Sequence, residues 1–450
     1  MHTLYNIYKQ HPSITTDSRR VEPGQLFFAL KGERFDGNSY AAEVLAKGAA
    51  LAVVDDPNVV PAGDSRYYLV DDVLTTLQQL AAYHREQFRT WQRPVTVIGI
   101  TGTNGKTTTK ELLRAVLSQK FRTLATEGNL NNQIGVPLTL LKVTPEHEMA
   151  VIEMGANHPM DIAELCAIVH PDYGLITNVG KAHLLGFGSL EGVIEAKTQL
   201  YRSLAADGGI AFIDSFNRAL LAKAMEIDVK CRPYLPSTVE SCSPYLKFNL
   251  YDTESDEPAL IQTHLIGSYN EINCQAAATV GRFFGVTLQQ CAQAIAAYEP
   301  QNMRSQLVDM GHGNQLIMDA YNANATSMNA ALTSFRLNDA PHKSVILGDM
   351  RELGSESQHE HQVVLDWLFT SGIKLDMIVL VGQEFVTAFK AKGLQYAATN
   401  AVNVRCYDCV DDLMADTATL ANLGGTILVK GSRGVQLEKA AECIKKLRCK

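Results

Sequence analysis

The sequence predicts an α/β fold divided into three domains, at residues 1–90, 91–300 and 301–450. A chain of 450 residues is too long for one ordinary hydrophobic core, because domains usually hold roughly 100–200 residues. Short apolar runs alternate with amphipathic helical stretches along much of the chain, which is typical of a largely parallel sheet covered by helices.

The first region is predicted to be a small α/β unit. Leu26-Phe-Phe-Ala-Leu30 and Ala50-Leu-Ala-Val-Val54 are apolar runs of strand length, and residues 41–47 between them form a helical stretch. Pro94 cannot continue a helix, so residues 87–94 are predicted to connect this unit to the next.

The second and third regions carry further runs typical of buried strands. In the second region these are Val95–Ile100, Met149–Met154, Tyr173–Asn178 and Gly209–Ile213. In the third region, which begins near Pro300, they are Ser344–Leu347, Met377–Val381 and Thr426–Val429. Residues 215–262 show only short strand-like pieces between polar turns, and no element is assigned there.

Composition and charge exclude some classes of function. Lys and Arg total 40 against 48 Asp and Glu, a net charge of -8 that argues against non-specific nucleic-acid binding. No run approaches the ~18 apolar residues of a membrane span, and the residues after Met1 lack a signal-peptide core, so we expect a cytoplasmic protein without a membrane span. The nine cysteines fit reduced thiols, and the lone C-x-x-C at Cys406 and Cys409 has no second pair for zinc.

The strongest motif is Gly99-Ile-Thr-Gly-Thr-Asn-Gly-Lys106-Thr-Thr-Thr, between a predicted strand and a helix with an apolar stripe. Glycines let backbone N–H groups approach a phosphate, and a helix N-terminus adds positive potential. Lys106 can neutralise phosphate charge, and the Thr107 hydroxyl can reach magnesium. The strict G-x-x-x-x-G-K-[ST] pattern fails at Ile100, which leaves a glycine-rich turn with a chance lysine as the alternative. The strand and helix around the loop favour nucleotide binding.

Polar residues follow the apolar runs at the edge where a parallel sheet forms its binding sites. Glu153 ends the run Ala150-Val-Ile-Glu, and a carboxylate in so apolar a strand needs a partner or a metal unless it points into solvent. Thr177 and Asn178 end the next run and lead to His183, a loop histidine of a kind that is more often structural than catalytic.

Lys197 lies on the apolar face of its predicted helix, four residues after Val193 and four before Tyr201. Burial would lower the pKa of this amine and make it reactive. The amine could then bind phosphate, or react with carbon dioxide to give a carbamate. The alternative is a lysine whose stem is buried while its ammonium group reaches water.

Three later clusters combine asparagine, arginine and aspartate. They are Gly267-Ser-Tyr-Asn270-Glu-Ile-Asn273, Met303-Arg304-Ser and Asp319-Ala-Tyr-Asn322-Ala-Asn324. Asparagine can contact an adenine edge, arginine suits phosphate, and aspartate suits a ribose hydroxyl. Each cluster alone could equally form turns.

Together these residues resemble the Mur ligase family and, more distantly, the folylpolyglutamate synthases. The resemblance spans nearly the whole chain, and within the family it is strongest to the ligases that add D-alanyl-D-alanine to UDP-N-acetylmuramoyl-tripeptide. Four stretches carry this closer match: Asp17-Ser-Arg-Arg-Val-Glu-Pro-Gly24 with Leu30-Lys-Gly-Glu-Arg-Phe-Asp-Gly37, Glu127-Gly-Asn-Leu-Asn-Asn-Gln-Ile-Gly-Val-Pro137, Ile152-Glu-Met-Gly-Ala-Asn-His-Pro159, and Leu347-Gly-Asp-Met-Arg-Glu-Leu-Gly354. The Asp-Asn-Pro-Arg signature usual in the ligases that add the third amino acid is absent.

Two positions depart from the family pattern. Tyr269 stands where the family commonly has a histidine, which affects the contact expected on the adenine side. Ala325 replaces a proline that is frequent after Asn324. Neither residue belongs to the groups needed for phosphoryl transfer.

The resemblance implies that the first domain holds a UDP-sugar, the second binds ATP and magnesium, and the third is a Rossmann-like domain that closes over the site. It implies that the terminal carboxylate of the peptide takes the γ-phosphoryl group of ATP, and that the amine of D-alanyl-D-alanine then displaces phosphate from the acyl phosphate. The expected cofactors are ATP and Mg²⁺, and the chain is expected to act as a monomer.

The resemblance also assigns roles to individual residues. The catalytic residues would be Lys106, Glu153, His183 and Lys197. ATP would be bound by Gly102, Thr103, Asn104, Gly105, Lys106, Thr107, Thr108, Asn270, Asn273, Arg304, Asp319 and Asn322. Magnesium would be held by Thr107, Glu153, His183 and a carbamylated Lys197. The UDP-substrate would be bound by Ser18, Arg19, Lys31, Gly32, Asp36 and Gly37, and the peptide and the acceptor by Asn129, Asn131, Asn132, Lys430 and Arg433.

Other functions stay open at this point. The nearest alternatives are a sister ligase that adds the third residue and a folylpolyglutamate synthase, which use other acceptors. An ATP-dependent switch protein is an alternative of another class, but it would need no cluster of polar groups at strand ends. The sequence does not identify the third residue of the peptide.

Overall fold

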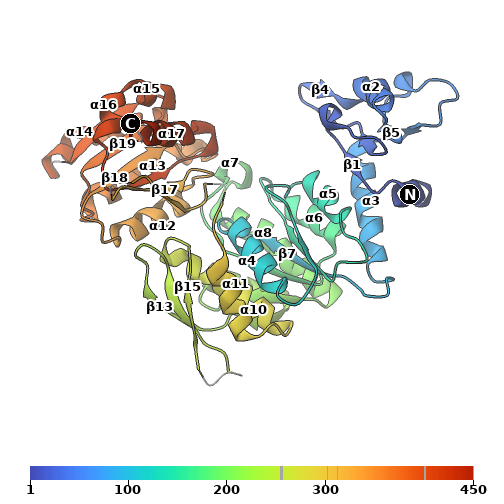
Figure 1. Cartoon of the computed structure of the whole chain (residues 1–450), viewed down its shortest axis with the longest axis horizontal. Coiled ribbons are helices and arrows are strands. Elements are labelled where there is room, and N and C mark those ends of the chain that lie inside the picture. The colour runs from blue at the N-terminus through green and yellow to red at the C-terminus, as the bar shows by residue number, and fades with distance from the viewer. Residues whose placement is uncertain (254–256, 302, 312, 400–401, 449–450) are drawn as a thin grey trace.

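The computed structural model describes residues 1–253, 257–301, 303–311, 313–399 and 402–448. It confirms the α/β class and the three-domain arrangement, with the N-terminal and C-terminal domains on either side of the central one (Figure 1). No helix within the described ranges is long and apolar enough to cross a membrane. The eight cysteines in those ranges are free thiols, as expected.

The N-terminal domain is built on a parallel sheet with the strand order β1-β2-β5-β6. Its strands are β1 Ile14–Thr15, β2 Leu26–Phe28, β5 Leu51–Val54 and β6 Tyr67–Leu69, and its helices are α1 His2–Gln10, α2 Ala41–Ala46 and α3 Val73–Gln87. The two apolar runs predicted here form β2 and β5, which are buried along their length. A hairpin of two exposed strands, β3 Lys31–Gly32 and β4 Phe35–Asp36, lies beside the sheet.

Helix α3 ties the N-terminal domain to the central one. Arg85 on this helix is buried, and its guanidinium donates to the Val169 carbonyl at 2.9 Å, the His170 carbonyl at 2.7 Å and Asp172 Oδ2 at 2.8 Å. Since α3 ends at Gln87, the connector expected before Pro94 is confirmed.

The central domain is a parallel sheet with the strand order β12-β11-β10-β7-β9-β8. Its strands are β7 Thr96–Thr101, β8 Thr123–Ala125, β9 Met149–Glu153, β10 Tyr173–Ile176, β11 Ile210–Ile213 and β12 Lys230–Pro233. Its helices are α4 Lys106–Leu117, α5 Gly135–Leu140, α6 Asp161–Val169, α7 Leu184–Phe187, α8 Leu190–Asp207, α9 Arg218–Ile227, α10 Glu271–Phe283 and α11 Leu288–Ala297.

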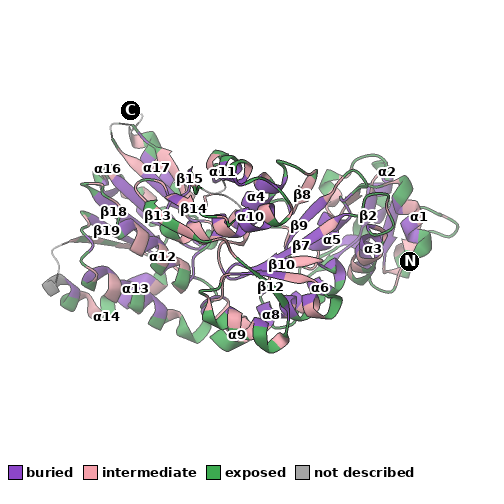
Figure 2. Cartoon of the chain, turned by 90° about the horizontal axis from the view of Figure 1, so that it is seen from below, coloured by how far each residue is buried: buried purple, intermediate pink, exposed green. Residues whose placement is uncertain are grey.

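Apolar side chains alternate between the two faces of this sheet. Val97 packs in the cluster formed with α5, α6 and α8, whereas its neighbour Ile98 packs in the cluster formed with α4, α10 and α11. Helices therefore cover both faces, as the near-continuous apolar runs predict. Figure 2 shows the buried strands between helices whose outer sides are exposed.

The segment to which the sequence assigned no element contains a small antiparallel sheet. Its strands are β13 Ser237–Ser241, β14 Lys247–Leu250 and β15 Ala259–Gln262. Only Phe248, Leu250 and Ile261 on these strands are buried, where they pack in the same cluster as α4, α10 and α11. So few inward-facing positions give too short an apolar pattern to identify a strand.

The C-terminal domain is a mostly parallel sheet with the strand order β16-β17-β21-β18-β19-β20, in which β16 alone among the described strands is antiparallel. Its strands are β16 Gln306–Asp309, β17 Gln315–Asp319, β18 Lys343–Gly348, β19 Met377–Val381, β20 Asn403–Tyr407 and β21 Thr426–Lys430. Its helices are α12 Ala325–Arg336, α13 Ser357–Thr370, α14 Gln383–Thr399, α15 Val410–Ala415, α16 Thr417–Asn422 and α17 Glu438–Arg448.

Candidate active site

A cavity of about 510 Å³ lies where the central and C-terminal domains meet. Groups from the phosphate loop, from the ends of β9 and β10, from α10 and from the C-terminal domain line it. Of the residues predicted for ATP, catalysis and the peptide, those that line it are Thr103, Asn104, Gly105, Lys106, Thr107, Thr108, Asn129, Asn131, Asn132, Glu153, His183, Asn270, Asn273, Arg304, Asp319, Asn322 and Lys430. The structure thus brings together residues that are up to 327 positions apart in the chain.

The phosphate loop joins β7 to α4, as the sequence predicts. Gly102 has φ 145°, and a Cβ atom there would lie 2.0 Å from Thr177 Oγ1. Gly105 has φ 79°, in the left-handed region, and a Cβ there would lie 2.7 Å from Asn273 Oδ1. Both positions therefore require glycine, although only Gly105 lines the cavity.

Two residues after β10 hold the loop in place. Asn178 accepts from the Thr103 N–H on its backbone carbonyl and from the Asn104 N–H on its side chain, both at 2.9 Å. The Thr177 hydroxyl donates to the Asn104 carbonyl at 2.6 Å. Sequence analysis placed these two residues at a strand end but gave them no role in the loop.

Lys106 begins α4 and lies in the centre of the loop. Its ammonium group donates to the backbone carbonyls of Gly102 at 2.7 Å and Thr103 at 3.1 Å. Burial lowers the pKa of this amine, the nearby Glu153 carboxylate opposes that shift, and Arg304 adds to it. A phosphate oxygen would offer this ammonium a charged acceptor in place of neutral carbonyls.

Glu153 is 1 % exposed and faces the start of α4. Its Oε1 atom accepts from Asn131 Nδ2 at 2.8 Å and lies 3.4 Å from the Thr107 hydroxyl. Its Oε2 atom is buried without a hydrogen-bond partner. A free carboxylate oxygen beside a hydroxyl fits a hard cation such as Mg²⁺. Within the described ranges no three His, Cys, Asp or Glu side chains form a metal cluster, so phosphate and water would complete such a coordination shell.

Lys197 is 2 % exposed, on the inward face of α8. Its pKa is lowered to about 7, first by burial and then by the Lys106 charge. Lys197 does not line the cavity; its ammonium lies 5.5 Å from the centre of the Phe187 ring. His183 lines the cavity and lies on the other side of the contact, with its ring centre 6.4 Å from that of Phe187.

His183 contacts the C-terminal domain. Its backbone has φ 51°, and its Nδ1 atom lies 2.5 Å from Glu352 Oε2. This pairing lowers the pKa of the Glu352 carboxyl. Glu352 comes from the Leu347–Gly354 stretch, so one function of that stretch is to meet the central domain.

The asparagines of α10 are bonded within the protein. Asn273 Nδ2 donates to Asn270 Oδ1 at 2.9 Å, and Thr109 Oγ1 donates to Asn273 Oδ1 at 3.1 Å. Asn270 Nδ2 donates to the Ile266 carbonyl at 2.8 Å. These bonds join α10 to α4 behind the loop, while both asparagines also line the cavity. Their contact with an adenine edge stays a prediction.

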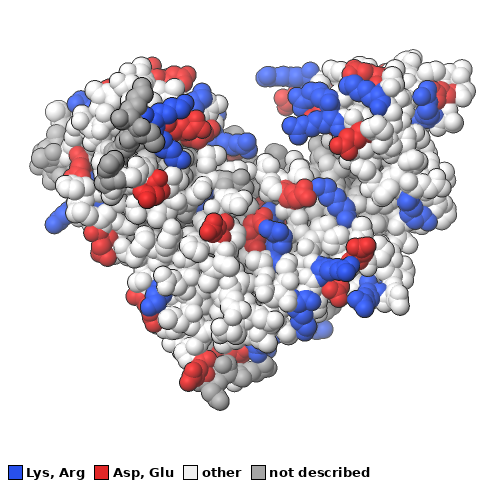
Figure 3. All heavy atoms as spheres, in the orientation of Figure 1, with Lys and Arg blue, Asp and Glu red and all other residues white. Residues whose placement is uncertain are grey.

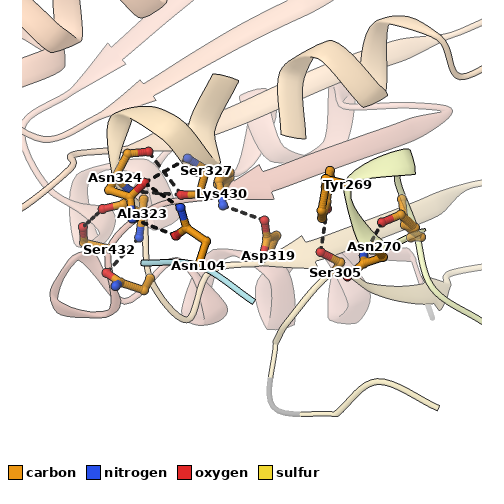
Figure 4. Close-up of polar contacts among 12 residues, drawn as sticks. Asn104, Tyr269, Asn270, Ser305, Asp319, Ala323, Asn324, Ser327, Lys430 and Ser432 are labelled. Carbon is orange, nitrogen blue, oxygen red and sulfur yellow. Dashed lines mark hydrogen bonds and ion pairs between the residues drawn. The ribbon is translucent and has the colours of Figure 1, made fainter. Parts of the chain in front are cut away.

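The C-terminal wall of the cavity consists of side chains that contact one another. Lys430 is 2 % exposed and donates to Asp319 Oδ2 at 2.6 Å (Figure 4). The Arg304 guanidinium stacks on the Tyr321 ring at 3.9 Å, and Arg433 lies over the same ring at 5.5 Å. The sequence assigned Asp319 and Lys430 to different ligands, but the structure shows that they form a pair. Arg433 does not line the cavity, and Tyr321, which does, was not predicted.

Direct contacts join the two domains beside the cavity. Asn324 Nδ2 donates to Asn104 Oδ1 at 2.8 Å, across 220 positions of sequence (Figure 4). Lys181 pairs with Glu360 at 2.7 Å, and its N–H donates to Thr326 Oγ1 at 3.2 Å. Tyr269, the departure from the family pattern, bonds through its hydroxyl to Ser305 Oγ at 2.8 Å next to Arg304.

The residues predicted for the UDP-substrate lie in the N-terminal domain and do not line the cavity. Lys31, in the β3–β4 hairpin, pairs with Asp55 at 2.8 Å, and Asp36 accepts from the Asn38 N–H at 2.9 Å. A Cβ at Gly37 would lie 2.6 Å from the Ala29 carbonyl carbon, so this position requires glycine. Of the other predicted residues, Ser18 and Arg19 lie in a short 3-10 helix and Gly32 in β3. Figure 3 shows basic side chains on the edge of this domain that faces the hollow between the outer domains.

Comparison with known proteins places these observations in a family. Three family models match: "Mur ligase family, catalytic domain" at residues 12–85, "Mur ligase middle domain" at 100–281, and "Mur ligase, glutamate ligase domain" at 303–433. The UDP-N-acetylmuramoyl-tripeptide--D-alanyl-D-alanine ligase of Bacillus subtilis is 35% identical over 95% of this chain and 91% of its own. The ligase of the same name from Escherichia coli is 35% identical over 96% and 93%.

Solved structures give the same result. MurF from Acinetobacter baumannii superposes with a TM-score of 0.84 at 32% identity, covering 96% of this chain and 93% of that one. The MurF ligase of Thermotoga maritima in complex with ADP superposes with a TM-score of 0.81 at 26% identity, covering 98% of both chains.

Proposed function

The chain belongs to the Mur ligase family, and on that premise we propose that it joins D-alanyl-D-alanine to UDP-N-acetylmuramoyl-tripeptide at the cost of ATP. The products are the UDP-linked pentapeptide used in peptidoglycan synthesis, ADP and phosphate. The observation that carries the proposal is the cavity itself, where the phosphate loop, Glu153 with a free carboxylate oxygen, and three asparagines of the Glu127–Pro137 stretch face arginine and lysine side chains of the C-terminal domain.

The first step is proposed to be phosphoryl transfer. The terminal carboxylate of the tripeptide attacks the γ-phosphorus of ATP, the bond to the β-phosphate oxygen breaks, and an acyl phosphate and ADP result. Lys106 would exchange its two backbone carbonyls for phosphate oxygens, and the N-terminus of α4 would add positive potential. Bound Mg²⁺, held by Thr107 and Glu153, would neutralise phosphate charge.

The second step is amide formation. The amine of D-alanyl-D-alanine attacks the acyl carbon, a tetrahedral intermediate forms, and phosphate leaves while the amine loses its proton. Arg304, Asp319, Lys430 and Arg433 come from the domain that closes the site, and they would position the nucleotide and the dipeptide. The protein would act in the cytoplasm, where these nucleotide substrates occur, and one chain supplies every group named, so a monomer suffices.

Lys197 is proposed to be carbamylated. Its neutral amine would attack carbon dioxide and release a proton, which leaves a carbamate anion on Nζ. A pKa of about 7 makes a large share of the amine neutral at physiological pH. The anion would lie behind the loop, close enough to Lys106 to interact with its charge, and beside Phe187 and His183.

The UDP part of the substrate is proposed to bind to the N-terminal domain, at the β3–β4 hairpin and the neighbouring 3-10 helix of Ser18 and Arg19. Lys31 and Arg19 are exposed and basic, as contacts to a diphosphate require.

A phosphate-release assay with purified protein tests the function. With ATP, Mg²⁺ and UDP-N-acetylmuramoyl-tripeptide, we expect phosphate release only when D-alanyl-D-alanine is added, together with the pentapeptide product by mass spectrometry. Turnover that instead depends on L-lysine or diaminopimelate with the UDP-dipeptide would identify a sister ligase and overturn the proposal. ATP hydrolysis without any peptide product would favour a switch protein.

A further inference from the structure

Lys110 is a completely buried lysine that the reaction described above does not use. It lies one helical turn after Lys106 on α4, with its side chain directed away from the phosphate loop toward residues 126–128. Lysine is rarely buried without full compensation, because an isolated ammonium loses much of its hydration free energy. Its surroundings should therefore explain its presence.

The ammonium group of Lys110 has three close acceptors. It donates to the Thr126 carbonyl at 2.6 Å, pairs with Glu111 Oε1 at 3.0 Å and lies 3.4 Å from the Gly128 carbonyl. These acceptors match its three N–H donors. Glu153 Oε2, at 3.9 Å, is therefore attracted by charge but not hydrogen-bonded, and it stays available for another ligand.

The segment that Lys110 contacts leads directly into the loop that lines the peptide side of the cavity. Thr126 is also bonded to β9, because its N–H donates to the Val151 carbonyl at 3.0 Å and its hydroxyl accepts from the Glu153 N–H at 2.9 Å. At the other end of the loop, the Gly155 N–H donates to the Asn131 carbonyl at 2.6 Å. Lys110 thus fixes the near end of a loop whose far end is bonded to the residues after β9.

We propose that Lys110 is a positioning residue that fixes the 126–132 loop to the helix of the phosphate loop, and that it thereby presents Asn129, Asn131 and Asn132 to the peptide substrate. Because Lys106 and Lys110 share one helix, the contact also sets the distance between the nucleotide side and the peptide side of the cavity. The substrate part of this proposal rests on the proposed function, whereas the loop part does not.

Lys110→Met tests the proposal, with Lys120→Met as the matched control. Lys120 also donates to two backbone carbonyls, those of Phe284 at 3.1 Å and Gly285 at 3.2 Å, but it is exposed and outside the cavity. Hydrogen–deuterium exchange of both variants, without any substrate, measures the loop. We expect amides of residues 127–132 and of Gly155 to exchange roughly tenfold faster in Lys110→Met, and to be unchanged in Lys120→Met.

Steady-state kinetics supply the second measurement. We expect the KM for the UDP-tripeptide to rise roughly tenfold in Lys110→Met while the KM for ATP stays within about twofold, since the phosphate loop keeps its own tethers to Thr177 and Asn178. Lys110→Arg, which keeps the charge and the donors, should recover part of the loss. If Lys110→Met does not fold, Glu111→Gln, which removes a partner of Lys110 at the surface, is expected to act in the same direction by roughly threefold.

Unchanged exchange in the loop would overturn the proposal, and so would equal increases in both KM values, which would indicate general loosening of the central sheet. The exchange measurement needs no activity. An inactive wild-type protein would therefore count against the proposed function, while a loop that exchanges normally in Lys110→Met would count against the role of Lys110.

Discussion

The two walls of the cavity are held in place by different kinds of contact. On the central side, Thr177 and Asn178 bind the backbone of the phosphate loop, so the Lys106 and Thr107 side chains are left for ligands. On the C-terminal side, Asp319 and Lys430 bind each other. A substitution in the first wall should therefore change the reaction and leave the fold intact, whereas one in the second should change stability as well.

Lys106→Met tests the first half of this comparison and should have the largest effect. Without the ammonium group, charge on the transferring phosphoryl group is not neutralised, and we expect kcat to fall at least about 10³-fold. The melting temperature should change by no more than about 3 °C, because the group lost is bonded only to carbonyls of the loop itself. Lys120→Met serves as the charge control. A global loss of structure by circular dichroism would show that the loop wall also carries stability.

Lys197→Ala is the next largest change. If the carbamate contributes a negative charge behind the loop, kcat should fall by roughly 10²-fold, and short carboxylic acids such as acetate should restore part of it. The measurement is kcat as a function of carboxylate concentration, with Lys106→Met as the control that no acid should rescue. Absence of rescue at every concentration would argue against the carbamate while leaving the site itself in place.

The pKa of Lys197 also gives a pH dependence of stability. In carbonate-free buffer the folded protein loses this proton near pH 7, whereas an unfolded lysine keeps it until about pH 10.4. The unfolded state binds more protons between those values, so this group makes the free energy of unfolding rise with pH across that window. Urea titrations at pH 7 and 9 should show a smaller rise in Lys197→Met than in the wild type.

Asp319→Ala tests the second half of the comparison. It leaves the buried Lys430 ammonium without its partner, and we expect unfolding of the C-terminal domain to become easier by about 3 kcal/mol, roughly 100-fold in the equilibrium constant. The double variant Asp319→Ala/Lys430→Met should recover much of that loss. Asp411→Ala, in the exposed pair with Lys439 of the same domain, should have little effect. Equal effects of the two aspartate variants in denaturant titrations would contradict the difference between the walls.

The sequence was sufficient for the first wall because its determinants are local. A strand, glycines, Lys106 and a helix are contiguous, and Glu153 stood out because it ends an apolar run. The second wall depends on pairs such as Asp319 with Lys430, 111 positions apart, and no single-chain pattern indicates which strand ends become neighbours. The three short strands within residues 215–262 were missed for a related reason, since only Phe248, Leu250 and Ile261 on them are buried.

Lys110 shows that part of what was missed had a detectable signal. It precedes Leu113 by three positions and Leu117 by seven, so it lies on the apolar face of its helix. The same spacing drew attention to Lys197. The helix N-terminus and its phosphate-loop lysine directed attention to Lys106 instead, and the partner carbonyls of Lys110 at Thr126 and Gly128 could be found only from the structure.

Asn324→Ser examines the point where the two walls touch, and it should have the smallest effect. Asn324 both caps α12, by accepting from the Ser327 N–H at 2.9 Å, and donates to Asn104 across the domain boundary. Serine retains the cap, because it is as good an N-cap residue, but it is too short to reach Asn104. Loss of one neutral hydrogen bond costs about 1 kcal/mol, so we expect the KM for ATP to rise roughly fivefold with an unchanged melting temperature.

Asn324→Ala separates the two roles of this side chain, because it removes the cap as well as the cross-domain bond. We expect the alanine variant to show the same rise in KM together with a lower melting temperature of the C-terminal domain. Asn104→Ala, made from the other wall, should reproduce the KM of Asn324→Ser, and the double variant should add nothing, because both changes remove one bond. Additive effects would mean that each asparagine contacts ATP by itself, and the two walls would then act on the nucleotide independently.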